Sequence, residues 1–344
     1  MNTKKIVIWI GVIFLVIVFF GILSIMRSER GPGDYDFSVW HDGLKRTYLV
    51  HVPPSYTGEN LTPVVLVLHG GGGNGESMKE FTLMDTTADK EGFIAVYPEG
   101  TGKKFFGKTL GSWNGGRCCP SAMEENVDDV GFISKMIDQL QADFNADQDR
   151  IFVTGHSNGA IMAYRLACEL SNKIAAIAPI GAQGVFESCP LERPVPTIHF
   201  HGTKDPCTGY AESRLCGGCS AEFFCKVSAI LCPEESFKWE CDSVPGFFDD
   251  WRELNRVTGA SQVTFENNNA TCITYGPSME DTEVSLCTIE DMGHQWPGGS
   301  YGSPCQEGLK SQKCMDWIKS MGPISQDISA NEAMWEFFKK HPLN

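Results

Sequence analysis

Residues 150–159 read Arg-Ile-Phe-Val-Thr-Gly-His-Ser-Asn-Gly, and an apolar, helix-forming segment follows at 160–170. A short apolar strand, a Gly-x-Ser-x-Gly turn and a helix are the pattern of a sharp turn that exposes a nucleophilic serine. Gly155 and Gly159 relieve the crowding of the backbone in such a turn. Ser157 then stands at the tip, beside a helix N-terminus that favours negative charge. The stretch predicts that Ser157 is a nucleophile on a strand–turn–helix unit.

Apolar runs alternate with helical patterns on both sides of this turn. Such runs lie at 64–68, 93–97, 151–154, 174–180, 197–200 and 284–289, residues 46–52 alternate as in a strand, and residues 127–144 carry apolar side chains at helical spacing. Continuous apolar runs are typical of strands buried on both faces of a parallel sheet. We therefore expect an α/β fold with a mostly parallel central sheet, helices on both faces and a site at the carboxyl ends of the strands.

A serine hydroxyl needs a base, and the base needs a carboxylate that orients it. His294 is the predicted base, because its loop directly follows the apolar run 284–289. Asp205 is the predicted acid, because it follows the run 197–200. The chain order Ser157, Asp205, His294 is the order expected in an α/β-hydrolase. Asp291 is a rival acid at a less suitable position.

Other polar residues near these loops have simpler interpretations. His156 and His201 flank strand ends, and we interpret them as packed, hydrogen-bonded imidazoles. Asp128 and Asp129 are expected to start the helix at 127–144, where carboxylates are favoured by the helix dipole.

The loop after the strand at 64–68 predicts one half of an oxyanion hole. It reads His-Gly-Gly-Gly-Gly-Asn-Gly over residues 69–75, so that its backbone can approach a substrate closely. We expect the backbone N–H groups of Gly71 and Asn158 to bind the developing alkoxide, with Gly72 as the open alternative to Gly71. No Gly-Lys-Ser/Thr follows this loop, which argues against a phosphate-binding loop.

The first thirty residues differ in kind from the rest. Residues 6–26 are uncharged and mostly apolar, and they are long enough to cross a bilayer as a helix. We expect a signal anchor at 6–26, a cytosolic N-terminus at 1–5, a stalk at 27–36 and a hydrolase domain at 37–344. If the segment is instead a cleaved signal, the protein is secreted.

The cysteines place the body of the chain outside the cytosol. All 14 follow the apolar segment, and an even, high number favours disulfides in an oxidising compartment. Two pairs suggest bridges, Cys272 with Cys287 and Cys305 with Cys314.

Asn60 and Asn269 begin glycosylation sequons. Beyond residue 30 the chain has 24 basic and 42 acidic residues, which argues against nucleic acid as a partner.

Taken together, these motifs make the chain resemble the secreted feruloyl-esterase and polyhydroxybutyrate-depolymerase-like group of α/β-hydrolases. The resemblance implies a Ser-Asp-His ester hydrolase with Ser157, Asp205 and His294 in the triad positions, and with no metal or organic cofactor. The matching residues are those of the turn at 155–159 together with residues 68–72, 97–100, 113–114, 118–119, 127–132, 201–206 and 293–298.

The chain departs from the group between Asp205 and a helix that contains Trp251 and Asn255. Asn255-Arg256-Val257 stands where the group has Asn-Gly-Cys. Residues 207–241 form an insertion that holds six cysteines. We interpret it as a disulfide-bonded cap near the mouth of the site, with a decorative surface excursion as an equal alternative. A zinc site, suggested by the Cys-Gly-Gly-Cys at 216–219, is a third interpretation that lacks a second ligand pair.

The expected function is the hydrolysis of carboxylic esters through an acyl-enzyme. The ester belongs to phenolic (feruloyl-type) or acetyl groups on polysaccharide, or to a polyhydroxyalkanoate-type polyester. The alternatives are a peptidase or acylaminoacyl hydrolase on the same fold, and a membrane-tethered binding protein with a hydrolase shell. Trp113, Asn114 and Trp296 are candidate substrate contacts, although each tryptophan could equally be core packing.

Overall fold

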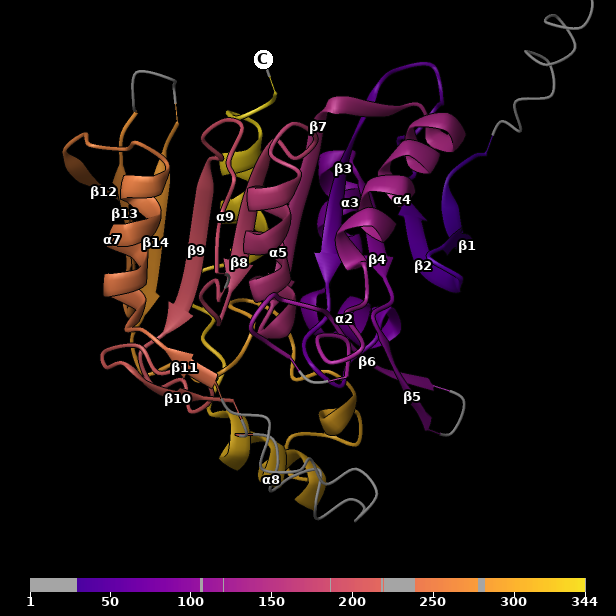
Figure 1. The fold of residues 1–344 in the computed structure, drawn as a ribbon. Coiled ribbons are helices and arrows are strands. Elements are labelled where there is room, and N and C mark those ends of the chain that lie inside the picture. The colour runs from indigo at the N-terminus through magenta and orange to yellow at the C-terminus, as the bar shows by residue number, and fades with distance from the viewer. Residues whose placement is uncertain are drawn as a thin grey trace, which may run out of the picture.

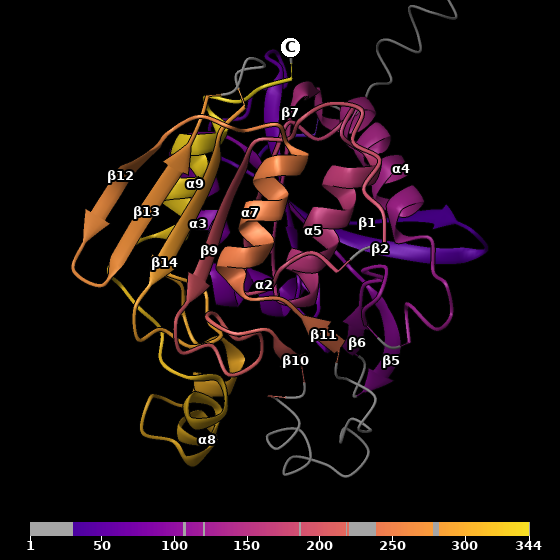
Figure 2. The same cartoon turned by 60° about the vertical axis from the view of Figure 1, so that its left-hand side comes forward.

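The central feature of the fold is a large mixed sheet with helices on both faces (Figures 1 and 2). The computed structural model describes residues 30–105, 108–119, 121–185, 187–217, 219, 239–277 and 282–343. Among these residues, ten strands form one sheet in the order β1-β2-β4-β3-β7-β8-β9-β14-β13-β12. The strands are β1 (Gly33–His41), β2 (Leu44–Val52), β3 (Thr62–Leu68), β4 (Ile94–Pro98), β7 (Ala146–His156), β8 (Ala176–Ile180), β9 (Thr197–Gly202), β12 (Ser261–Asn267), β13 (Ala270–Tyr275) and β14 (Val284–Ile289).

The six central strands, β4, β3, β7, β8, β9 and β14, are parallel to one another. They are the apolar runs that the sequence predicts, and every residue of β3, β4, β8 and β9 is buried. Antiparallel strands complete both edges. The expected α/β fold with a parallel centre is therefore confirmed, and the carboxyl ends of the parallel strands lie together at the lower end of Figure 1.

Helices cover both faces of the sheet and enclose two apolar cores. The helices α4 (Asp129–Phe144), α5 (Asn158–Glu169) and α7 (Val244–Leu254) lie on one face, in front in Figure 1, and α2 (Gly75–Thr82), α3 (Met84–Glu91) and α9 (Ala330–Phe338) lie on the other. Asp128 caps α4 by accepting the N–H of Gly131 at 2.9 Å, which confirms the expected start of this helix. Beyond the strand ends lie α8 (Gln312–Met321), the short helix Ser303–Cys305 and two small hairpins, β5 (Thr101–Phe105) with β6 (Lys108–Ser112) and β10 (Arg214–Cys216) with β11 (Trp239–Cys241).

The start of the domain differs from the expectation. Gly33–His41 is a strand that pairs along its whole length with β2, so residues 33–36 belong to the sheet rather than to a stalk. The predicted anchor at 6–26 and the predicted cytosolic segment at 1–5 lie outside the described residues. Among the residues that are described, no helix is long and apolar enough to cross a membrane.

Six disulfides join the twelve described cysteines in pairs. Both predicted bridges are present, Cys272–Cys287 between β13 and β14 and Cys305–Cys314 beside α8. The others are Cys118–Cys119, Cys168–Cys189, Cys207–Cys219 and Cys216–Cys241. The zinc interpretation of residues 216–219 is therefore wrong, because both of its sulfurs are in disulfides and cannot act as thiolate ligands. Cys225 and Cys232 lie outside the described residues.

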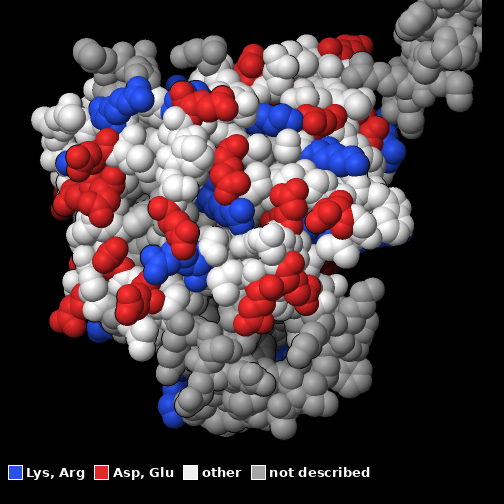
Figure 3. Space-filling view, viewed as in Figure 1, with Lys and Arg blue, Asp and Glu red and all other residues white. Residues whose placement is uncertain are grey.

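Acidic and basic side chains are interspersed over the described part of the face shown in Figure 3. One mixed cluster joins β2 to α3. His51 Nδ1 contacts Asp34 at 2.6 Å and its Nε2 contacts Asp89 at 2.8 Å, and Lys79 lies 3.1 Å from Asp85. Burial lowers the pKa of His51, but its bonds to Asp34 and Asp89 and the charge of Asp85 outweigh burial and raise the pKa overall.

The His51 cluster makes stability depend on pH. Because the folded state raises the pKa of His51 above its ordinary value of 6.5, the stabilisation is fully present below that value and is lost as the pH rises through the folded pKa. We expect His51→Gln to lower the free energy of unfolding by about 0.5–1 kcal/mol at acidic pH. Urea unfolding of both proteins from weakly acidic to alkaline pH measures this difference. A difference that grows with pH contradicts the assignment.

Candidate active site

Ser157 stands between the end of β7 at His156 and the start of α5 at Asn158. Its backbone has φ 56° and ψ −120°, a conformation that non-glycine residues rarely adopt. The strain is held in place by the Ser157 N–H, which donates to the carbonyl of Ile180 at 2.9 Å, and by α5, whose first turn bonds back to the Ser157 carbonyl. The side chain is half-buried at the carboxyl end of the sheet. Local geometry therefore agrees with the predicted sharp turn.

Gly159 is required by the close approach of α5 to β3. A Cβ at this position would meet the backbone carbonyl oxygens of Leu68 and His69. We expect Gly159→Ala to lower the free energy of unfolding by about 2–4 kcal/mol, because the backbone must shift to accept the methyl group. Denaturant unfolding measures the loss, and Gly31→Ala is the matched control because nothing lies within 4 Å of its Cβ position. A loss for Gly159→Ala as small as that of the control contradicts this packing.

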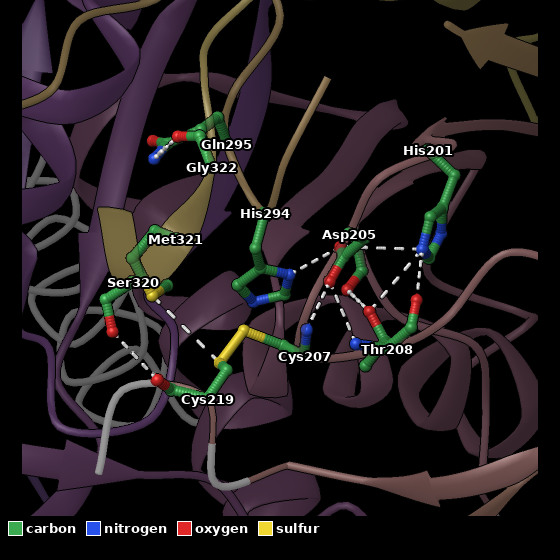
Figure 4. The surroundings of a disulfide bond; sticks show 11 residues. His201, Asp205, Cys207, Thr208, Cys219, His294, Gln295, Ser320, Met321 and Gly322 are labelled. Atoms are coloured by element: carbon green, nitrogen blue, oxygen red, sulfur yellow. Dashed lines mark hydrogen bonds and ion pairs between the residues drawn. A yellow bond between two sulfur atoms is a disulfide. The ribbon is translucent and has the colours of Figure 1, made fainter. Parts of the chain in front are cut away.

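Asp205 and His294 are bonded to each other beyond the ends of β9 and β14 (Figure 4). His294 Nδ1 lies 2.6 Å from Asp205 Oδ2, and both residues are almost fully buried. The other carboxylate oxygen, Oδ1, accepts the backbone N–H groups of Cys207 at 2.7 Å and Thr208 at 2.9 Å. The acid is thus fixed by its own loop and presents one oxygen to the imidazole.

The electrostatics of this pair keep Asp205 ionised. Burial raises the pKa of its carboxyl, but the charge of His294 and its hydrogen bond, aided by His201 and the Thr208 N–H, lower the pKa to about 2. A carboxylate at Oδ2 is an acceptor, so the bonded Nδ1 of His294 carries the hydrogen. Nε2 of the neutral ring is then free of hydrogen and can accept a proton.

The imidazole of His294 and the backbone of Ser157 meet at the end of β8. Ser157 is bonded to Ile180, and the next residue, Gly181, has its Cβ position 3.3 Å from His294 Nδ1. The ring of His156 packs against that of His294 with centroids 4.4 Å apart. Burial lowers the pKa of His156 well below its ordinary value, with a further contribution from His294. His156 is therefore a packed neutral ring, as the sequence suggests, but the expected hydrogen bonding is incomplete, because its buried Nε2 has no partner among the described residues.

A buried hydrogen-bonded chain of His201, His199 and Tyr164 runs into the core beside Asp205. His201 Nε2 lies 2.7 Å from the Thr208 carbonyl and 3.5 Å from Asp205 Oδ2, so it must carry a hydrogen. In the neutral ring, Nδ1 then accepts from His199 Nε2 at 3.0 Å, and His199 Nδ1 accepts from the Tyr164 hydroxyl at 3.0 Å. The chain ends on the Thr208 carbonyl, and the nearby His201 favours the charged form of Asp205 electrostatically. The sequence suggested a packed His201 but gave no sign of His199 and Tyr164.

The glycine-rich loop after β3 lies beside the start of α5. The Gly72 N–H donates to the carbonyl of Gly111 at 2.8 Å, which removes it as an oxyanion donor. Among the described residues no acceptor is bonded to the N–H of Gly71, and its Cβ position is 3.8 Å from the Cβ of Asn158. Gly71 and Asn158 are therefore the two candidates that the local geometry favours.

His69 holds this loop in place, a role that the sequence did not indicate. Its Nε2 accepts the N–H of Gly100 at 2.9 Å, so Nδ1 carries the hydrogen and donates to the carbonyl of Gly70 at 2.8 Å. Burial lowers the pKa of His69 to about 4. The ring thus stays neutral at ordinary pH and fixes the peptide that precedes Gly71.

The three candidate substrate contacts are buried side chains, namely Trp113, Asn114 and Trp296. Both tryptophan rings have an exposed fraction of 0% and Asn114 has 4%, which contradicts the expectation that they contact a substrate. The indole N–H groups are used internally, by the His69 carbonyl for Trp113 and by the Asn331 side chain for Trp296, at 2.9 and 2.8 Å. The alternative interpretation, core packing beside the site, accounts for both rings.

The backbone of Trp113 positions the side chain of Asn158. Its N–H donates to Asn158 Oδ1 at 2.7 Å and its carbonyl accepts from Asn158 Nδ2 at 3.0 Å. The N–H of Asn114 donates to Asp129, which is also bonded to the buried guanidinium of Arg46 at 2.7 Å. Asn158 is therefore held at the N-terminus of α5 by a buried polar network.

Neither the rival acid Asp291 nor a separate cavity is placed to take part in acyl transfer at Ser157. Asp291, the rival acid, is exposed and forms an ion pair with Lys204 at 2.6 Å. A cavity of about 430 Å³, lined in part by Arg150, Phe152 and Trp335, lies at the opposite, amino ends of the strands and contains none of the residues of the predicted triad.

Among the described residues, two clusters each bring three potential metal-ligating side chains together, and neither suits a metal. In the first, Asp205 and His294 are joined by Cys207, whose sulfur is in a disulfide and is no thiolate. In the second, Asp34, His51 and Asp85 are already satisfied by one another and by Lys79.

Known proteins with similar sequences are esterases by name. Residues 46–189 match the family described as Esterase PHB depolymerase. The chain is 28% identical over 251 residues to a bifunctional acetylxylan esterase/xylanase of Neocallimastix patriciarum and 27% identical over 262 residues to feruloyl esterase B of Piromyces equi. These matches cover 71% and 75% of this chain but only 30% and 44% of the two relatives. A putative esterase of Nocardia uniformis subsp. tsuyamanensis is 26% identical, with 75% of this chain and 73% of the relative covered.

The fold has a counterpart among solved structures. An acetyl xylan esterase from Aspergillus awamori aligns with a TM-score of 0.51 and 15% identity, over 84% of this chain and 99% of that one. At this identity the likeness concerns the α/β-hydrolase fold alone.

Proposed function

We propose that this chain is a serine carboxylic-ester hydrolase, because residues 46–189 match the family described as Esterase PHB depolymerase. The observation that carries the proposal is the buried bond of 2.6 Å between His294 and Asp205, next to a strained serine at the tip of a strand–helix turn. A serine in such a turn and an imidazole oriented by a carboxylate are the two parts of an acyl-transfer site. No step requires a metal or an organic cofactor.

In the proposed mechanism His294 removes the hydroxyl proton of Ser157, whose oxygen attacks the ester carbonyl. The backbone N–H groups of Gly71 and Asn158 bind the oxyanion, at the positive end of α5. Asp205 stabilises the imidazolium that forms. His294 then protonates the leaving alcohol, and a water molecule, deprotonated by the same ring, releases the acid from Ser157.

The proposed substrates are esters of the kinds that the relatives' names mention. These are feruloyl or acetyl esters of polysaccharide and, from the family description, polyhydroxyalkanoate-type polyester. A peptidase or acylaminoacyl hydrolase and a non-catalytic binding shell are the other candidates, since a fold does not fix its substrate. The buried hydrogen bonds that fix Asp205 and Asn158 support a working site rather than a non-catalytic binding shell.

We further propose that the domain works outside the cytoplasm. Six disulfides among the described residues support an oxidising compartment. The apolar segment at 6–26 would hold it to the membrane, or direct its secretion if cleaved. Asn60 and Asn269 are both exposed, which is compatible with the proposed glycosylation.

The insertion at 207–241 would shape the acyl or alcohol pocket. Its first cysteine, Cys207, donates its backbone N–H to Asp205 Oδ1, which supports a position at the site.

The experiment that tests the function is a substrate panel on the purified protein. It comprises methyl ferulate, acetylated xylan, short hydroxybutyrate oligomers and peptide amides. We expect hydrolysis of at least one ester class and kcat/KM for peptide amides lower by a factor of about 1000 or more, since the amide leaving group is harder to expel. Preferential amide hydrolysis supports the peptidase, and no hydrolysis together with no labelling by a fluorophosphonate supports the binding shell.

A further inference from the structure

The disulfide between Cys207 and Cys219 lies directly beside the bonded pair of Asp205 and His294 (Figure 4). The Cys207 sulfur, a carboxylate oxygen of Asp205 and a ring nitrogen of His294 all lie within 4.8 Å of one another. Cys207 is only 3% exposed. The bridge therefore forms part of the wall that encloses the acid and the base.

At one end the bridge holds the acid. Cys207 follows Asp205 by two residues, and its backbone N–H donates to Asp205 Oδ1 at 2.7 Å. Its carbonyl accepts the N–H of Gly217 at 2.9 Å, where the chain returns toward Cys219. A displacement of Cys207 therefore displaces a hydrogen-bond donor of the carboxylate.

At the other end the bridge reaches the segment that holds the base. The Ser320 hydroxyl donates to the carbonyl of Cys219 at 2.9 Å, and the sulfur of Met321 lies 4.0 Å from that of Cys219. The Met321 carbonyl in turn accepts the backbone N–H of His294 at 2.7 Å. The C-terminal end of α8 is thus in contact with both Cys219 and His294.

We propose that the Cys207–Cys219 disulfide is a positioning clamp for the Asp205–His294 pair. The contacts close a ring that runs from Asp205 through the disulfide to the end of α8, on to His294 and back to Asp205. The acid loop and the base loop come from different strands. The disulfide fixes Cys219 against the end of α8, whose Met321 carbonyl is bonded to the N–H of His294, so it limits the relative movement of the two loops. The inference rests on the proposed function, because the clamp matters only where the pair takes part in proton transfer.

The test compares two variants that each lose one disulfide. Cys207→Ala/Cys219→Ala removes the clamp, and Cys168→Ala/Cys189→Ala is the control at the end of α5 remote from Ser157. The two bridges have sequence separations of 12 and 21, and because the entropy of loop closure changes only logarithmically with length, comparable losses of stability are expected. We expect the clamp variant to lose about 10- to 100-fold in kcat, because small displacements of catalytic groups are costly. KM for a short aryl ester should stay within about twofold, and kcat of the control within about twofold of the parent.

Labelling of Ser157 by a fluorophosphonate gives a second readout, and its rate should fall in parallel with kcat only in the clamp variant. Circular dichroism establishes that each variant is folded at the assay temperature. If the clamp variant does not fold, Ser320→Ala decides, since it cuts the bond to Cys219 and leaves the disulfide intact. We expect it to lower kcat about two- to fivefold at unchanged KM, a smaller loss than a full displacement of the pair.

A folded clamp variant with the kcat of the control overturns the proposal, as does an unaffected Ser320→Ala where only that variant folds. Ser157→Ala in the same assay separates this failure from that of the proposed function. If Ser157→Ala stays active, the proposed function is wrong, whereas an inactive Ser157→Ala beside a fully active clamp variant refutes the clamp alone.

Discussion

Ser157→Ala is expected to lower kcat for an activated aryl ester by a factor of about 10⁴ or more, with the protein still folded. The alanine has no oxygen to form the acyl-enzyme, and the oxyanion donors alone leave only a small residual rate. Stability should change by no more than about 0.5 kcal/mol, because the substitution keeps the same backbone strain and removes one half-buried hydroxyl.

Initial rates and a thermal unfolding curve on the same sample measure both effects. Ser38→Ala, an exposed residue of β1, is the control and should keep the parent rate. A Ser157→Ala protein with more than about a tenth of the parent kcat removes Ser157 from the mechanism.

Asp205→Asn is expected to lower kcat about 10³- to 10⁴-fold while the local structure persists. In the variant Oδ1 keeps its bonds to the N–H groups of Cys207 and Thr208, so the new NH₂ group faces His294 Nδ1. The ring must then accept at Nδ1 and carry its hydrogen at Nε2. That tautomer cannot take the proton of Ser157.

Asp291→Asn is the matched control, because it removes the rival carboxylate and its exposed ion pair with Lys204. Its kcat should stay within about twofold of the parent. The opposite ranking, with a silent Asp205→Asn and a damaging Asp291→Asn, would assign the acid to Asp291. Because the pKa of Asp205 is about 2, protonation of this carboxyl does not limit the rate at any pH near neutrality.

The parallel centre of the sheet could be predicted from the sequence because strands buried on both faces need unbroken apolar runs. The predicted triad residues followed from these runs, since each comes directly after one. The edge strands carry weaker signals: β12 is almost entirely exposed, and Gly33–Asp36 resembles a linker although it pairs with β2. An exposed strand needs no apolar face and leaves little mark on the sequence.

The supporting residues of the site could not be predicted, because their roles depend on contacts between distant segments. Tyr164 and His199 meet only when α5 packs on β9. The sequence leaves Trp113 open as a substrate contact or a core residue, and only the packed structure shows that its ring lies inward and bonds to the His69 carbonyl. The contact between Cys219 and the end of α8 joins residues about a hundred positions apart.

The most direct test of the account is to trap the covalent intermediate. The protein is mixed with an excess of an aryl ester that deacylates slowly, quenched in acid and digested, and the acylated peptide is identified by mass spectrometry. We predict that the acyl group is found on Ser157 and that it is absent from the Ser157→Ala protein. An acyl group on another residue, or turnover with no adduct on the Ser157 peptide, would contradict the account.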